Sequence, residues 1–182
     1  EAFHQLDGRR LWQHRVEAQG QMAGVHDKHN LASPSPVSDG QMVYAWFGTG
    51  QIVALDMNGK VVWERHLGTE ISPFNVIWGH SSSPTLYRDA LILLCDHEPS
   101  SYLLAVDKRT GKELWRADRG KGRMSYSTPL VVDTPSGPEL IVNSSERVDA
   151  YDPRNGTLLW YTGGTNRFPI PMPVFHNGVI YM

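Results

Sequence analysis

Short runs of alternating apolar and polar residues recur along the whole chain, and Gly, Asp, Asn and Pro separate them. These runs of about four to eight residues are rich in Val, Ile, Leu, Tyr and Trp, which is typical of β-strands. In the first full unit they cover approximately "PVSD", "MVYAWF", "QIVALD" and "KVVWERH". No segment has the 3.6-residue apolar period of an amphipathic helix, so we expect an all-β protein with almost no helix.

One phrase occurs four times, as "HQLDGRRLW" (4–12), "ALDMNGKVVW" (54–63), "AVDKRTGKELW" (105–115) and "AYDPRNGTLLW" (150–160). Its Gly and Trp keep the same spacing in every copy: Gly8–Trp12, Gly59–Trp63, Gly111–Trp115 and Gly156–Trp160. A second landmark, a proline that opens an apolar run, recurs in step with it at Pro36, Pro84, Pro129 and Pro173. Two landmarks in step indicate a true internal repeat.

A repeat of about 45–50 residues with four strands per unit is typical of a β-propeller blade. We predict one propeller domain over 1–182, built of four-stranded antiparallel blades. The predicted blades are, approximately, 1–16 (partial), 34–67, 82–117, 127–162 and 171–182 (partial). An arc of a seven- or eight-bladed ring is the favoured arrangement. Alternatively, the two ends pair into a composite blade, which closes a four-bladed ring or joins two chains into eight blades.

The repeated residues are expected to be structural. The tryptophans would fill the space between neighbouring sheets, and the aspartates would accept hydrogen bonds from turn N–H groups beside the glycines. These residues are Trp12, Trp63, Trp115 and Trp160, then Asp56, Asp107 and Asp152, and Gly59, Gly111 and Gly156. The pairs Asp39-Gly40, Asn58-Gly59, Asn155-Gly156 and Asn177-Gly178 predict tight turns of type I′, with positive φ at both central residues.

Composition narrows the function classes only slightly. A net charge of -2 over 182 residues gives no general attraction to nucleic acid, and no apolar run is long enough for a transmembrane segment. The single cysteine, Cys95, cannot form an internal disulfide. The chain begins without Met and ends within a predicted strand, so we expect it to be a piece of a longer protein. An open arc exposes strand edges, and self-association is therefore expected.

A Pro-led strand followed by A-x-D-x-x-T-G-x-x-x-W resembles the pyrroloquinoline quinone (PQQ) repeat family, and "AVDKRTGKELW" fits this phrase throughout. The family contains quinone-dependent alcohol and glucose dehydrogenases. It also contains non-enzymatic propellers, such as the lipoprotein scaffold of the bacterial outer-membrane β-barrel assembly machinery. The chain looks closer to these BamB-like members than to the dehydrogenases. The resemblance implies a periplasmic or otherwise extracytoplasmic location.

The dehydrogenases of the family imply a site that the sequence does not reproduce. They have adjacent cysteines, a Ca²⁺ ion held by Glu, Asn and Asp, a catalytic Asp and a tryptophan on which the quinone stacks. We match no catalytic residue to this pattern. Trp46 and Trp78 are the tryptophans outside the repeated phrase, and are therefore the candidates for cofactor binding. No cofactor is expected unless the dehydrogenase alternative holds, in which case PQQ and Ca²⁺ are implied.

Function is expected in the loops that do not repeat, because propeller strands serve as the scaffold. His26, Asp27 and His29 have ligand types that suit a metal, but solvated histidines are favoured because no further ligand is evident. Arg119, Lys121 and Arg123 form a basic loop that could pair with an acidic partner. The residues proposed for partner binding are His80, Asp96, His97, Glu98, Arg119, Arg123, Glu146 and Arg147.

Two functions follow from these observations. The favoured one is a non-catalytic binding or scaffold module that docks a protein or polymer through its inter-blade loops. The alternative is part of a PQQ- and Ca-dependent alcohol or sugar dehydrogenase.

Overall fold

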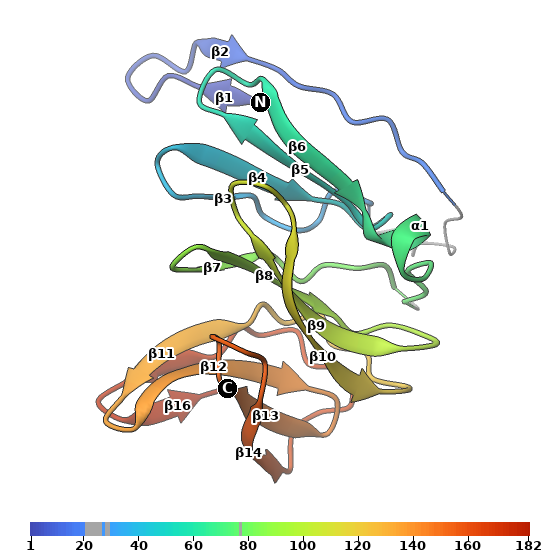
Figure 1. Ribbon diagram of the computed structural model, residues 1–182, viewed down its shortest axis with the longest axis vertical. Helices are drawn as coiled ribbons and strands as arrows, with labels where there is room; N and C mark the ends of the chain where they lie inside the picture. The colour runs from blue at the N-terminus through green and yellow to red at the C-terminus, as the bar shows by residue number, and fades with distance from the viewer. Residues whose placement is uncertain (21–26, 28–29, 77) are drawn as a thin grey trace.

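The computed structural model describes residues 1–20, 27, 30–76 and 78–182, which fold almost entirely into β-strands. Three four-stranded antiparallel sheets lie in a row, with a two-stranded sheet at each end (Figure 1). The strands are β1 (Ala2–Phe3), β2 (Arg10–Trp12), β3 (Val37–Ser38), β4 (Met42–Trp46), β5 (Gln51–Asp56), β6 (Val61–His66), β7 (Thr85–Tyr87), β8 (Ala90–Cys95), β9 (Ser101–Asp107), β10 (Glu113–Gly120), β11 (Leu130–Thr134), β12 (Gly137–Ser144), β13 (Arg147–Tyr151), β14 (Leu158–Gly163), β15 (Val174–His176) and β16 (Val179–Tyr181). Within these ranges the helical structure is one turn, α1 (Leu67–Glu70), and no helix could span a membrane.

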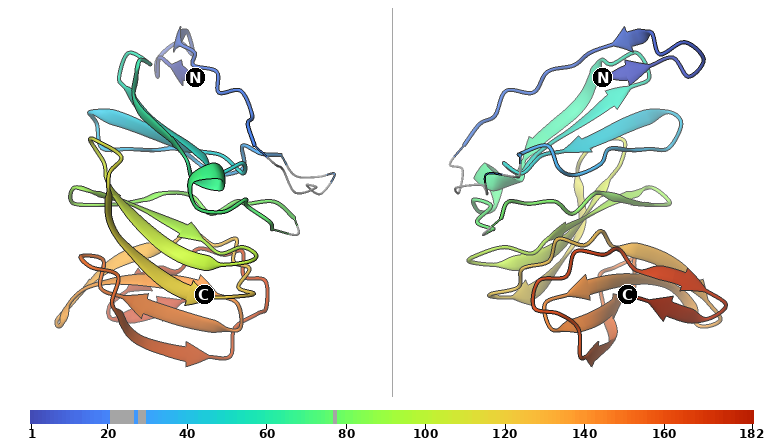
Figure 2. Two further views of the ribbon diagram at one scale, coloured as in Figure 1. Left: turned by 45° about the vertical axis from the view of Figure 1, so that its right-hand side comes forward. Right: turned by 180° about the vertical axis from the view of Figure 1, so that it is seen from behind.

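Each four-stranded sheet is a blade whose strands pair in chain order. We call β3–β6 the first blade, β7–β10 the second blade and β11–β14 the third blade. The predicted fold class, an all-β arc of propeller blades, is therefore confirmed. Closure of the ring by the chain's own ends is not observed, because β1–β2 and β15–β16 form separate sheets at opposite ends of the row (Figures 1 and 2).

Apolar side chains fill the interfaces between successive blades. The central strands of the second blade are covered on both sides, so every residue of β8, "ALILLC", is buried. Leu91 and Leu93 face the first blade, whereas Ile92 and Leu94 face the third. A continuous apolar run is the pattern expected of a strand buried on both faces. The third blade packs in turn against Phe175 and Ile180 of β15–β16.

The repeated tryptophans join each blade to the next. All four lie on the outermost strand of their sheet, and the indole N–H of Trp12, Trp63 and Trp115 donates a hydrogen bond to a backbone carbonyl in a turn of the following blade. The bonds are Trp12 Nε1 to Met57 O (2.9 Å), Trp63 Nε1 to Lys108 O (2.9 Å) and Trp115 Nε1 to Pro153 O (3.2 Å). One contact therefore recurs at three successive interfaces.

The repeated glycine lies directly against the tryptophan ring of the preceding blade. A Cβ placed on Gly111 would approach the ring of Trp63 to 2.7 Å, and φ of Gly111 is +71°. Gly59 and Gly156 have the same relation to Trp12 and Trp115, at 2.6 Å in each case. Both the left-handed backbone and the missing side chain are thus required at this position.

The repeated aspartate stabilises the same turn from its other side. Asp107 Oδ1 accepts hydrogen bonds from the backbone N–H groups of Arg109 and Thr110 over 3.1 and 2.9 Å. It also accepts one from the Thr110 hydroxyl, and these bonds lower the pKa of Asp107 below its ordinary value.

The predicted turn type is correct at only one of the four pairs. Both central residues have positive φ at Asn177-Gly178, whereas only the glycine does so at Asp39-Gly40, Asn58-Gly59 and Asn155-Gly156. The aspartate or asparagine instead hydrogen-bonds the backbone two residues later in two of these turns, Asp39 with Gln41 N and Asn155 with Thr157 N. A side chain that caps the turn in this way lets a single left-handed glycine reverse the chain.

The contact between tryptophan and glycine is unmatched at both ends of the row. Trp160 donates to Glu139 Oε2 of its own blade over 2.8 Å and is 37% exposed. Gly8 has φ +68° but no atom within 4 Å of a Cβ built on it. The self-association expected of open faces stays a prediction.

A comparison of Gly8 with Gly111 separates the energetic cost of a left-handed backbone from the cost of steric overlap with a tryptophan ring. We predict that Gly8→Ala lowers the free energy of unfolding by about 1–2 kcal/mol, the cost of a left-handed backbone. Gly111→Ala should cost about 1–3 kcal/mol more, because its methyl group overlaps the Trp63 ring. Urea unfolding of the two variants measures the difference. Equal losses would show that the ring contact contributes nothing.

Candidate functional site

The non-repeating connections gather at one end of the blades, which we call the loop face. It comprises the turn between the second and third strands of each blade and the connections that follow β6, β10 and β14. Leu67 N donates to Gly50 O over 2.8 Å, and Glu146 N donates to Asn166 O over 3.0 Å, so the two kinds of connection are bonded to each other. Both kinds of connection therefore open on the same face.

A buried arginine joins the second and third blades beneath the loop face. Arg119, at the end of β10, donates from Nε and Nη2 to the two carboxylate oxygens of Asp96 over 2.8 and 3.0 Å. It also donates to Asp149 Oδ2 (3.0 Å), Tyr151 OH (2.6 Å) and Ser144 Oγ (2.7 Å). The side chains of Arg119, Asp96 and Asp149 are 0% exposed. A planar guanidinium fits this set of acceptors, and a lysine would not.

Two further arginines extend this network toward solvent. Arg123 lies 3.3 Å from Asp149 Oδ2, and its Nε donates to Arg119 O over 2.5 Å. Arg147 Nε lies 2.5 Å from Asp149 Oδ1. Three arginines thus surround two aspartates, which leaves one positive charge uncompensated. We call Arg119, Arg123, Arg147, Asp96 and Asp149 the arginine network.

The charges of the network act on one another's pKa. Burial alone would lower the pKa of Arg119, but Asp96 outweighs it and the pKa lies above its ordinary value. Burial and the nearby Arg119 lower the pKa of Arg123 below its ordinary value. Burial is the larger of these two causes, and repulsion by the like charge of Arg119 adds to it.

An open pocket of about 440 Å³ lies over the arginine network on the loop face, and we call it the basic pocket. The guanidinium of Arg147 lies 4.5 Å from the ring centre of Tyr161, which is 62% exposed. The pocket is lined by Lys121, Gly122, Arg123, Ser145, Glu146, Arg147, Tyr161 and Gly163. Three cations and one carboxylate make it suited to an anionic group.

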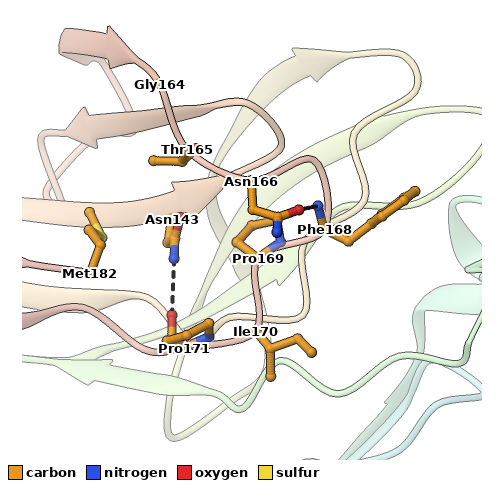
Figure 3. A pocket seen from close by; sticks show the side chains of 9 residues that line it. All are labelled: Asn143, Gly164, Thr165, Asn166, Phe168, Pro169, Ile170, Pro171 and Met182. Atoms are coloured by element: carbon orange, nitrogen blue, oxygen red, sulfur yellow. Dashed lines mark hydrogen bonds between the residues drawn. The ribbon is translucent and has the colours of Figure 1, made fainter.

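A second pocket, of about 420 Å³, lies where the connection after β14 passes the end of β12 (Figure 3). Asn143 Nδ2 donates to Pro171 O over 3.1 Å, and Phe168 N donates to Asn166 Oδ1 over 3.0 Å. The lining residues are Asn143, Gly164, Thr165, Asn166, Phe168, Pro169, Ile170, Pro171 and Met182, none of which is charged. This pocket therefore offers amide groups and apolar surface.

Aromatic rings occupy the corresponding place between the first and second blades. Trp46 lies 4.2 Å from His80 and 5.9 Å from Phe74, and Phe74 stacks on His97 at 4.3 Å between ring centres. All four side chains are buried. Burial lowers the pKa of His97 below its ordinary value, although the ring Nδ1 donates a hydrogen bond to Glu98 O over 3.0 Å. Burial therefore favours the neutral form of His97.

The structure separates the predicted partner-binding residues into two groups. His80, Asp96, His97 and Arg119 are buried and cannot touch a partner in this conformation. The physical reason is that each is enclosed by a neighbouring blade, His80 and His97 among aromatic rings and Asp96 and Arg119 in their ion pair. Glu98, Arg123, Glu146 and Arg147 retain exposed surface.

The candidate cofactor residues are also in different environments. Trp46 is 1% exposed, and its ring is covered by Phe74 and His80, so it has no free face for a quinone. Trp78 is 39% exposed and packs beside Tyr126 and Phe168. Both oxygens of Asp96 are bonded to Arg119 and so do not fit a calcium ligand. Neither Trp46 nor Asp96, as placed here, has the free ring face or the free carboxylate oxygens that a quinone or Ca²⁺ would need.

The candidate metal ligands His26 and His29 lie outside the described residues, and Asp27 is exposed. Over 1–20, 27, 30–76 and 78–182, no three His, Cys, Asp or Glu side chains are grouped so as to hold a metal ion.

Sequence reasoning missed Ser144, Asp149, Tyr151 and Tyr161. Asp149 and Tyr151 belong to β13, "RVDAY", whose last four residues are buried. A charged residue in a strand that is buried on both faces was the available signal, because such a charge requires a partner.

Comparison with known proteins gives a family and a fold. The sequence profile of the family described as outer membrane protein assembly factor BamB matches residues 1–167. None of the curated proteins matches the sequence.

Among solved structures, BamB from Moraxella catarrhalis superposes with a TM-score of 0.64 at 16% identity, over 84% of this chain and 46% of that protein. The quinohemoprotein alcohol dehydrogenase ADHIIG from Pseudomonas putida HK5 gives a TM-score of 0.55 at 17% identity, over 72% of this chain and 20% of that one. The corresponding dehydrogenase from Comamonas testosteroni gives 0.54 at 21% identity, over 74% and 22%. The chain thus spans less than half the length of each of these proteins, and the likeness at these identities concerns the fold.

From the arginine network we predict that replacing either of two arginines of β10 lowers the free energy of unfolding by different amounts. Arg119→Met should lower the free energy of unfolding by about 3–5 kcal/mol, because Asp96 and Asp149 are left buried without their main partner. Arg116→Met, which removes an exposed pair with Glu113, should cost at most about 1 kcal/mol. Urea unfolding measures both. A loss at Arg119 no larger than that at Arg116 would contradict the structural role of the network.

His97 predicts a pH dependence of stability. Its pKa is depressed in the folded state relative to 6.5, so the unfolded chain binds the proton more readily. The contribution of His97 is complete above about pH 6.5 and decreases as the pH falls below it. Between pH 7.5 and 5 the free energy of unfolding should therefore fall more in the natural chain than in His97→Gln. Exposed His176→Gln is the control, and an identical pH slope in all three chains would refute the prediction.

Proposed function

The chain belongs to the BamB-like family of PQQ-repeat β-propellers, and on that premise we propose that it is a non-catalytic binding module whose loop face docks a protein partner. The proposal is supported by one observation: the residues that hold the blades together are different from those that line the pockets. The repeated Trp and Gly residues hold the blades together. Two open pockets on the loop face of the third blade are instead built mainly from connections that do not repeat.

The partner we propose is a protein of the outer-membrane assembly pathway, in keeping with the family's description as an outer membrane protein assembly factor. Such a partner places the chain outside the cytoplasm, in the periplasm. A docking role also suits the mixed chemistry of the loop face, because one pocket is cationic and the other is uncharged. Protein surfaces offer charged and apolar groups side by side, and an interface uses both.

Site-specific photo-crosslinking tests this function in cells that produce the protein. A photoreactive residue in place of Lys121 or Ile170, both on the loop face, should give one cross-linked protein of that pathway. The same residue in place of Lys60 or Arg109, exposed in turns at the opposite end of the blades, should not give it. Cross-linking of the same partner from Lys60 or Arg109 alone would place the interface elsewhere and refute the proposal.

The dehydrogenase alternative is tested with the same protein. Addition of PQQ and Ca²⁺ should produce neither stoichiometric binding of the quinone nor reduction of an electron-accepting dye with alcohols or sugars. Turnover in this assay would overturn the non-catalytic reading.

A further inference from the structure

We propose that the basic pocket binds a carboxylate side chain of the docked protein, so that the segment contacting this part of the loop face is acidic. This inference rests on the proposed docking function and specifies the chemistry of its partner. It concerns Lys121 and Arg123, which follow β10, and Arg147, which begins β13.

The first argument is charge. Lys121, Arg123 and Arg147 line the pocket, and Glu146 is the one carboxylate among its lining residues. Asp149 lies beneath and cannot neutralise the excess, because it is already shared by Arg119, Arg123 and Arg147. An incoming negative charge would therefore meet a positive potential that the protein does not compensate itself.

The second argument is the fixed orientation of the two arginines. Arg123 donates to the backbone oxygen of Arg119 and to Ser144 Oγ, the latter over 3.2 Å. Arg147 stacks against the ring of Tyr161 and pairs with Asp149. Guanidinium groups held in place lose little freedom when an anion binds, and their paired N–H groups match the two oxygens of a carboxylate.

The third argument is access to the cations that line the pocket. The pocket is wide open, so that a side chain carried on another protein can enter it. Its volume of about 440 Å³ suits one or two side chains. A carboxylate on a docked protein can therefore reach the arginines, and free phosphate and anionic lipid headgroups are the alternative occupants that the experiment distinguishes.

Binding of short peptides to the full chain tests the proposal. The probe is a blocked peptide, acetyl-Gly-Glu-Asp-Glu-Gly-amide, and its matched control replaces each acid by the corresponding amide. Isothermal titration at low salt should show binding of the acidic peptide and none of the amide peptide, with affinity that falls as salt is added. Equal binding of the two peptides would overturn the proposal. So would stronger binding of inorganic phosphate or of phosphatidylglycerol vesicles than of the acidic peptide.

Charge variants supply a readout that a structural role would not give. Lys121→Gln should weaken binding of the acidic peptide by about three-fold, and Glu146→Gln should strengthen it by about the same factor. Lys60→Gln, an exposed lysine at the opposite end of the blades, should leave it unchanged. Urea unfolding verifies that all three variants remain folded. Weakening by both Lys121→Gln and Glu146→Gln, or by neither, would overturn the proposal.

The cross-linking experiment separates this inference from the function on which it rests. If no loop-face position cross-links a partner, the docking function itself fails. If the partner cross-links through Ile170 equally well in the natural chain and in Lys121→Gln/Arg123→Gln, docking stands and the carboxylate contact is wrong. Reduced cross-linking in the double variant, with no change in Lys60→Gln, supports both.

Discussion

The contact of a tryptophan with a glycine of the next blade is the constraint on which the architecture depends. Trp63 requires both a carbonyl acceptor at Lys108 and a gap where Gly111 has no side chain. The same phrase that supplies this glycine supplies Trp115, four residues later, for the following interface. The glycine of each phrase therefore contacts the tryptophan of the preceding blade, and the tryptophan of the same phrase contacts the next blade. The contact is thus repeated along the row. Spacing between Gly and Trp is fixed because a shift of one residue would turn the ring to the other face of its strand.

Beneath the loop face, where the repeated residues make no contact, the interfaces between successive blades differ from one another. Between the first and second blades the enclosed space holds the rings of Trp46, Phe74, His80 and His97. Between the second and third blades it holds Arg119 with its two aspartates. Buried ions are costly to desolvate, and apolar residues would commonly serve stability as well or better. Retaining an arginine network has a consequence that apolar packing lacks, since it leaves net positive charge under the basic pocket.

The fold could be predicted from the sequence because its determinants are local and repeated. Trp, Gly and Asp recur within one short phrase, and a strand–turn–strand unit is visible without knowing what it packs against. The site could not be predicted in the same way. Asp96 and Arg119 look like polar loop residues, yet they pair across 23 positions, and Arg119 reaches Asp149 across 30. Burial of such groups depends on which blade covers them, which a single-sequence pattern does not record. The turn types were misjudged for a related reason, since the side chain of Asp39 or Asn155 caps its own turn.

In a repeat protein, substitution of a repeated residue and substitution of a loop-face residue have different consequences. Loss of a repeated tryptophan or glycine affects an interface of the same kind wherever it occurs, because the contacts of Trp12, Trp63 and Trp115 are nearly equivalent. Residues of the loop face have no equivalents in the other blades, and a change there alters one location only. The arginine network links the two sets, because Arg119 holds two blades together while Arg123 and Arg147 extend its charge to the surface. Substitution of Lys121 or Glu146 therefore changes the charge of the basic pocket without altering how the blades assemble, whereas a change at Arg119 affects both.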